Sequence, residues 1–214
     1  MNSTHSVDAL PEPQKQIFAL GVFVLNFAAT ESVFLNNLCV MAQISDQFAR
    51  AALSGVRAEA AIGYIRRFFE VTNAISAERE SYEHVFNQFQ SISQARNLLL
   101  HHGIKWVGPD PKLPFGHAFV SSDRARALTE AKTRTVPISS ALLNQMSEDL
   151  FRIMWLLTEF HIAQGRQPWR ISEQVQSTLR RPWLYKPPQA QTRKPRPQSA
   201  KATRKSKQAP KGQR

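Results

Sequence analysis

The sequence predicts an all-α protein, an up-and-down helical bundle with a small β-like insertion and a disordered basic C-terminal tail. Between residues 14 and 164, apolar side chains recur at the three-and-four spacing of amphipathic helices. Residues 186–214 instead contain ten Lys or Arg, no acidic residue and no apolar residue larger than Ala or Pro, so they cannot build a core. At 214 residues, the chain is long enough for one well-buried core.

The first helix is expected to follow a polar leader of residues 1–13 and to run from about Gln14 to Gln43. The charged Glu31 falls within its apolar stripe, which comprises Ile17, Leu20, Val24, Phe27, Phe34 and Leu38. Ser45 and Asp46 then provide good N-cap residues for a short helix that ends before Gly55.

Two further helices are predicted over residues 57–73 and 77–102. The second carries an inward stripe of Tyr82, Val85, Phe86, Phe89 and Ile92. Arg96 lies seven residues after Phe89, so the same spacing brings this charged residue to the apolar side of the helix.

Residues 104–137 contain short β-like pieces between Pro and Gly residues and form the predicted insertion. A last long helix, capped by Ser139 or Ser140, reaches about Gln164 and completes a bundle domain of residues 14–165. Residues 166–185 are rich in aromatic and basic side chains, including Trp183. We expect this segment to dock on the bundle, and stacking on nucleic-acid bases is the alternative.

The composition restricts the location and cofactors of the protein. Its single cysteine, Cys39, excludes an internal disulfide and a Cys-rich zinc site and fits a cytoplasmic protein. Asp8 and Glu12 before the apolar stretch argue against a signal peptide, and polar residues within 17–42 argue against a membrane span. The histidines show no metal-ligand spacing and there is no Gly-rich phosphate loop, so we expect neither a metal nor a cofactor.

The net charge of +12 is concentrated in the tail. Outside residues 186–214, 18 basic residues nearly balance the 16 acidic ones. The sequence therefore predicts a basic tail that binds nucleic acid through phosphate contacts, and it does not establish a basic patch on the folded surface.

The segment Gln94–Gly103 places Arg96 and Asn97 about one helical turn before His101 and His102. An arginine is suited to bind a phosphate and to stabilise a charged transition state, and an imidazole can transfer protons near neutral pH. The alternative is ordinary helix-end chemistry, in which Gly103 caps the helix and a histidine faces the negative end of its dipole.

Arg96, Asn97 and His101 resemble the Arg-Asn-x-x-x-His signature of the HEPN superfamily, in order and spacing. The resemblance implies a helical bundle over residues 14–165 and a metal-independent endoribonuclease that cleaves RNA as a homodimer. It also implies a setting in phage defence or a toxin–antitoxin pair, with a partner protein such as an antitoxin. The sequence departs from the family pattern because His102 separates His101 from Gly103, so the choice between the two histidines as the acid/base group stays open.

Opposite charges on the inward stripes of two helices predict a buried ion pair between Glu31 and Arg96. This pair would be purely structural or would orient Arg96 toward a phosphate. The alternative is an edge position at which both side chains reach water. Asn97 shares a helix face with His101 and is expected to orient its imidazole. Arg96 and His101 are about 140° apart around an ideal helix, which favours a site shared between two copies of the chain. A non-enzymatic interaction module with a nucleic-acid-binding tail is the alternative function.

Overall fold

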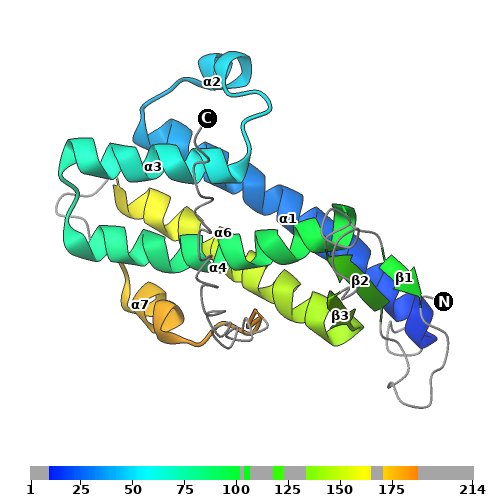
Figure 1. Ribbon diagram of the computed structural model, residues 1–214. Helices are drawn as coiled ribbons and strands as arrows, with labels where there is room; N and C mark the ends of the chain where they lie inside the picture. Colours follow the sequence, from blue (N-terminus) through cyan, green and yellow to red (C-terminus); the bar gives the residue numbers. More distant parts are fainter. Residues whose placement is uncertain (1–9, 102–103, 107–117, 123–133, 165–170, 188–214) are drawn as a thin grey trace, which may run out of the picture.

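The computed structural model describes residues 10–101, 104–106, 118–122, 134–164 and 171–187. This part of the chain is mostly helical, as predicted (Figure 1). Its helices are α1 Glu12–Met41, α2 Asp46–Ala52, α3 Ala58–Thr72, α4 Ser76–His101, α6 Ser140–Gln164 and α7 Glu173–Arg180. Residues 1–9 of the predicted leader and residues 188–214 of the tail lie outside the described residues, so the predicted disorder of the tail stays a prediction. Helix α1 begins at Glu12, inside the stretch that was predicted as leader.

Serine side chains define the starts of three of these helices. The hydroxyl oxygen of Ser45 accepts a hydrogen bond from the backbone N–H of Phe48, and that of Ser172 accepts one from Val175. Ser139, rather than Ser140, provides the corresponding contact for α6, at 3.2 Å to the nitrogen of Leu142. Each cap satisfies a backbone donor that the helix itself leaves unpaired.

Aromatic side chains fill the space between α1 and α4. The rings of Phe27 and Phe89 stack with centroids 5.2 Å apart, and those of Phe34 and Phe89 lie 4.7 Å apart. Further along, the hydroxyl of Tyr82 donates a hydrogen bond to Oδ1 of Asn37. Residue numbers therefore rise along α1 as they fall along α4, so the two helices are antiparallel.

The other two long helices also run antiparallel to α4. Two contacts fix the direction of α3: Glu59 contacts Ser93 of α4, and Arg66, further along α3, pairs with the earlier Glu83. Two more fix α6: Asp149 contacts Gln88, and Phe160, further along α6, contacts the earlier Tyr82. Consequently α1, α3 and α6 share one direction, which the colours of Figure 1 also show. The predicted up-and-down order is therefore wrong for the first connection. The segment with α2 carries the chain back along the bundle before α3 begins.

Three short strands, β1 Ile104–Trp106, β2 Ala118–Ser122 and β3 Arg134–Ile138, lie within the segment where β-like pieces were expected. They form an antiparallel sheet in the order β1-β2-β3. In Figure 1 the sheet lies beside the first turns of α1, at the end of the bundle where α4 finishes.

Helix α3 begins at the level of Ser93, before the last turns of α4. Glu59, in the first turn of α3, accepts a hydrogen bond from the hydroxyl of Ser93. Because α4 continues from Ser93 to His101, its last two turns extend beyond the start of α3. The residues on these turns, with the facing part of α1, make up the candidate site.

Candidate functional site

The guanidinium of Arg96 is held by two neighbours. Its central carbon lies 5.2 Å from the ring centroid of Phe27 on α1, at the end of the row of aromatic side chains between α1 and α4. Its Nη1 donates a hydrogen bond to Oδ1 of the adjacent Asn97, at 3.1 Å. Arg96 is half-buried and Asn97 is exposed, so the positive charge is fixed in position near the surface.

The predicted ion pair between Glu31 and Arg96 is not formed in the structure. Glu31 is half-buried on α1, and no ion pair joins these two described residues. The register of the helices explains the difference. Phe27 lies opposite Arg96, and Glu31 lies one turn further along α1, toward the level of Phe89 on α4. Phe27 therefore occupies the place that we had predicted for the carboxylate.

The histidines are only partly placed. His101 is the last residue of α4, but its side chain and the whole of His102 lie outside the described residues. Asn97, which was expected to orient the imidazole of His101, is seen accepting a hydrogen bond from Arg96. The structure thus brings Arg96, Asn97 and the backbone of His101 to one helix end, and it does not bring Glu31 to Arg96.

The charge of Arg96 is not neutralised by the residues that the structure describes around it. Among the described residues, no carboxylate lies within ion-pair distance of its guanidinium. A cation–π contact such as that with Phe27 is worth about 0.5–1 kcal/mol at an accessible site and leaves the formal charge intact. A guanidinium with a fixed direction and no anionic partner in the described part of the chain is suited to bind a phosphate.

A second polar centre, which the sequence analysis missed, holds the segment of residues 171–187 against α4 and α6. We call this segment the strap. The buried carboxylate of Asp149 accepts hydrogen bonds from the backbone nitrogens of Leu184 (3.1 Å) and Tyr185 (2.8 Å) and from Nε2 of Gln88 (2.8 Å). One signal could have revealed it, because Asp149 lies between Met146 and Ile153 on the apolar stripe of its helix.

Arg152 holds the strap from the other direction. Its guanidinium donates hydrogen bonds to the backbone oxygens of Thr178, Arg181 and Pro182 and lies 4.1 Å from the ring centroid of Trp183. His84 on α4 stacks against the same ring. Trp183 therefore contacts side chains of the bundle, as docking of this segment requires.

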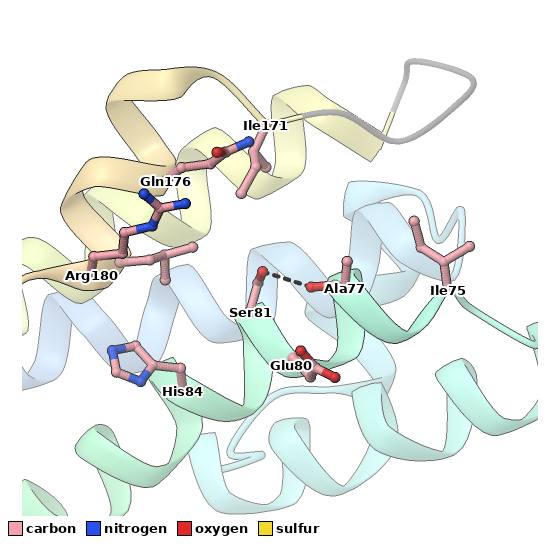
Figure 2. Close-up of a pocket in the computed structure, with 9 residues that line it drawn as sticks. Ile75, Ala77, Glu80, Ser81, His84, Ile171, Gln176 and Arg180 are labelled. Carbon is pink, nitrogen blue, oxygen red and sulfur yellow. Dashed lines mark hydrogen bonds between the residues drawn. The ribbon is translucent and has the colours of Figure 1, made fainter.

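A pocket of about 590 Å³ lies between α4 and the strap. Figure 2 shows Ser81 and His84 on α4, with Gln176 and Arg180 across from them on α7. The acidic Glu80 on α4 also lines the pocket, and four apolar residues complete the lining, namely Ile75, Ala77, Ile171 and Leu179. The hydroxyl of Ser81 donates to the backbone oxygen of Ala77, so Ser81 does not donate to His84 as a catalytic serine would.

Within the described ranges, no group of three or more His, Cys, Asp or Glu residues is arranged to hold a metal ion.

Comparisons with protein-family models, with curated proteins and with solved structures gave no match. The functional argument below therefore rests on the chain's own residues.

Proposed function

We propose that the protein is a metal-independent endoribonuclease that cleaves RNA with Arg96 and His101. The observation that carries this proposal is the state of Arg96, whose guanidinium is held against Phe27 and Asn97 with no acidic partner in the described residues. A purely structural arginine in this half-buried position would be expected to pair with a carboxylate. This guanidinium and the histidine at the same helix end together support phosphate chemistry.

The reaction needs only groups of this kind. The ribose 2′-oxygen attacks phosphorus while its proton passes to a base, and the bond from phosphorus to the 5′-oxygen breaks as that oxygen receives a proton. The products are a 2′,3′-cyclic phosphate and a 5′-hydroxyl. Arg96 would bind the phosphate and stabilise the charge of the pentacoordinate transition state. His101 would transfer one of the protons.

Asn97 has a positioning role in this proposal, because its amide oxygen holds the guanidinium of Arg96. Glu31 has no role in holding Arg96. The distance along and around α4 between Arg96 and His101, about 7.5 Å and 140° in an ideal helix, favours contributions from two copies of the chain to one phosphate. In that arrangement Arg96 of one copy and His101 of the other act together.

The test is cleavage of a fluorescent single-stranded RNA in the presence of EDTA. We expect the wild-type protein to cleave it and to leave 2′,3′-cyclic phosphate ends, detected by mass spectrometry. Arg96→Ala and His101→Ala should abolish cleavage. His161→Ala is the matched control, since His161 is an exposed histidine on α6. Normal cleavage by folded Arg96→Ala and His101→Ala proteins would refute the proposal.

A non-enzymatic interaction module is the second candidate, and one observation favours it. α1 exposes large apolar side chains, with Leu25 exposed to 71%. Such a surface is typical of protein–protein contacts. A wild-type protein that binds RNA or a protein partner and cleaves no RNA would support this alternative.

A further inference from the structure

The pocket of about 590 Å³ between α4 and the strap lies well away from the candidate site. Ala77, which lines the pocket, precedes Arg96 by 19 residues on α4, a separation of about 28 Å along an ideal helix. The residues that line the pocket have no part in the proposed cleavage of RNA. We therefore treat the pocket as a separate site.

Both walls of the pocket are held in place by the fold. The wall on α4 belongs to a helix whose Tyr82 and Val85 are fully buried in the bundle. The wall on α7 is attached through the buried Val175 and through the hydrogen bonds that Asp149 and Arg152 make with the strap. The pocket therefore exists before any ligand arrives, as is usual for small-molecule sites.

The two walls carry opposite charges. Glu80 contributes a carboxylate from α4, and Arg180 contributes a guanidinium from α7 (Figure 2). Both residues are exposed to solvent, and they do not form an ion pair with each other or with any other residue that the structure describes. A molecule in the pocket can therefore contact a negative group and a positive group separately.

The rest of the lining is mainly apolar. Four apolar residues belong to it, namely Ile75, Ala77, Ile171 and Leu179. Ser81 donates its hydroxyl proton to the backbone oxygen of Ala77, so toward a ligand its oxygen acts as an acceptor. Gln176 adds an amide, which can donate and accept. An apolar lining with a few polar groups that fix orientation is typical of sites for small organic molecules.

His84 serves as part of the wall. Its ring stacks on Trp183 and forms a hydrogen bond with the backbone of Leu179, so the strap already occupies it. Burial lowers the pKa of His84 below 6.5, which leaves the imidazole uncharged at neutral pH. Glu80 and Arg180 are therefore the charged groups with which the lining can recognise a ligand.

We propose that this pocket binds a small zwitterion with an apolar body, the chemical class of the apolar amino acids. Arg180 pairs with the carboxylate of the ligand, Glu80 pairs with its ammonium group, and the apolar body contacts Leu179 and Ile171. An organic anion would pair with Arg180 but would also face Glu80, and a cation would meet the reverse difficulty. Charge complementarity therefore favours a ligand that carries both charges.

RNA is the competing occupant, because the chain as a whole is basic. Its phosphates would pair with Arg180, but they would also approach Glu80 and the exposed Glu173 in the first turn of α7. Like charges at these positions oppose the binding of a polyanion. The observations therefore favour the zwitterion.

The experiment measures the affinity of the full chain for L-phenylalanine by isothermal titration calorimetry at neutral pH. We expect one ligand to bind per chain. Hydrocinnamate, which lacks the ammonium group, and phenethylamine, which lacks the carboxylate, should each bind about tenfold more weakly or worse. An excess of polyuridylate should leave the affinity for L-phenylalanine unchanged.

Two variants assign the charges to their residues. Arg180→Gln should weaken the binding of L-phenylalanine about tenfold and leave that of phenethylamine unchanged, because phenethylamine has no carboxylate. Glu80→Gln should weaken L-phenylalanine to a similar extent and should not weaken hydrocinnamate. Arg181→Gln is the matched control, since Arg181 is the adjacent exposed arginine and does not belong to the pocket lining. Circular dichroism checks that each variant is folded.

A wild-type protein that does not bind L-phenylalanine would overturn the inference. Equal affinities for L-phenylalanine and hydrocinnamate would also overturn it, because the ligand would then be an organic anion. Normal binding by both Arg180→Gln and Glu80→Gln would place the ligand elsewhere, and displacement by polyuridylate would assign the pocket to nucleic acid. Failure of the proposed function is distinguishable, because Arg96→Ala should bind L-phenylalanine normally whether or not the wild type cleaves RNA.

Discussion

Trp183 lies against His84, with ring centroids 5.1 Å apart and an angle of 26° between the ring planes. This contact joins the strap to α4 on the side of the bundle where Arg152 of α6 also meets Trp183. A titratable imidazole therefore lies at the junction of three segments.

Acidification should loosen the strap. Burial lowers the pKa of His84 below its usual value of 6.5, and the nearby Arg152 lowers this pKa further. The docked state thus prefers the neutral imidazole, so its stability should fall as the pH falls through about 6.5 toward the lowered pKa and then level off. Tryptophan fluorescence and thermal unfolding from pH 8 to pH 5 will measure the effect. His84→Phe should keep the stack and lose this pH dependence, and an unchanged profile in that variant would assign the titration to another group.

Replacing Asp149 with Ala should destabilise the protein by on the order of 3 kcal/mol. The change leaves the backbone N–H groups of Leu184 and Tyr185 without their acceptor, and the amide of Gln88 keeps only its hydrogen bond to the backbone oxygen of Tyr185. Urea unfolding followed by circular dichroism provides the measurement. The adjacent Glu148 is exposed, so Glu148→Ala is the control and should change the free energy of unfolding by less than about 0.5 kcal/mol.

Glu31 and Arg96 should contribute to stability independently. Because no ion pair joins them, a double-mutant cycle with Glu31→Ala and Arg96→Ala should give a coupling free energy below about 0.5 kcal/mol. The single change Arg96→Ala should cost about 0.5–1 kcal/mol through the lost contact with Phe27. A coupling of several kcal/mol would show that the two side chains pair in solution.

His101→Ala should reduce RNA cleavage by about a hundredfold to ten-thousandfold, the usual contribution of a proton-transfer group. His102→Ala should cost much less, since His102 is rotated about 100° further around the helix and has no Asn four residues before it. Initial rates with saturating RNA provide the comparison. The reverse order of effects would assign the acid/base role to His102.

Removing residues 188–214 should leave the melting temperature nearly unchanged and weaken binding to nucleic acid. Nine of the ten basic residues of the tail are lost, and each phosphate contact adds to the salt dependence of binding. Fluorescence anisotropy with a labelled oligonucleotide at several salt concentrations will test this. If full-length and truncated proteins bind equally at every salt concentration, the tail has no part in the affinity.

The positions of the helices could be predicted from sequence because local signals determine them. Apolar spacing located each long helix, and Ser45 and Ser139 marked helix starts. The direction of α3 could not be predicted, since nothing local in residues 42–57 shows how far the chain travels between α1 and α3. The pairing of Glu31 with Arg96 failed for a related reason. Helix periodicity gives the face of a residue and leaves its level along the neighbouring helix undetermined.

The position of Asp149 on an apolar stripe marks it as unusual, but its partners could not be predicted, for a different reason. Its partners in the strap are backbone atoms about 35 residues further along the chain. Every non-proline residue has the same backbone N–H group, so such a contact leaves no pattern in the partner's sequence.

The way in which Asp149 and Arg152 hold the strap also bears on which substitutions the protein can tolerate. Both side chains bind mainly to backbone atoms, at Thr178, Arg181, Pro182, Leu184 and Tyr185. Exposed strap positions such as Arg181 and Leu184 can therefore change identity while the attachment persists. The constraint falls on two residues of α6, so the surface of the strap can diverge and acquire new binding preferences while the bundle beneath it stays the same.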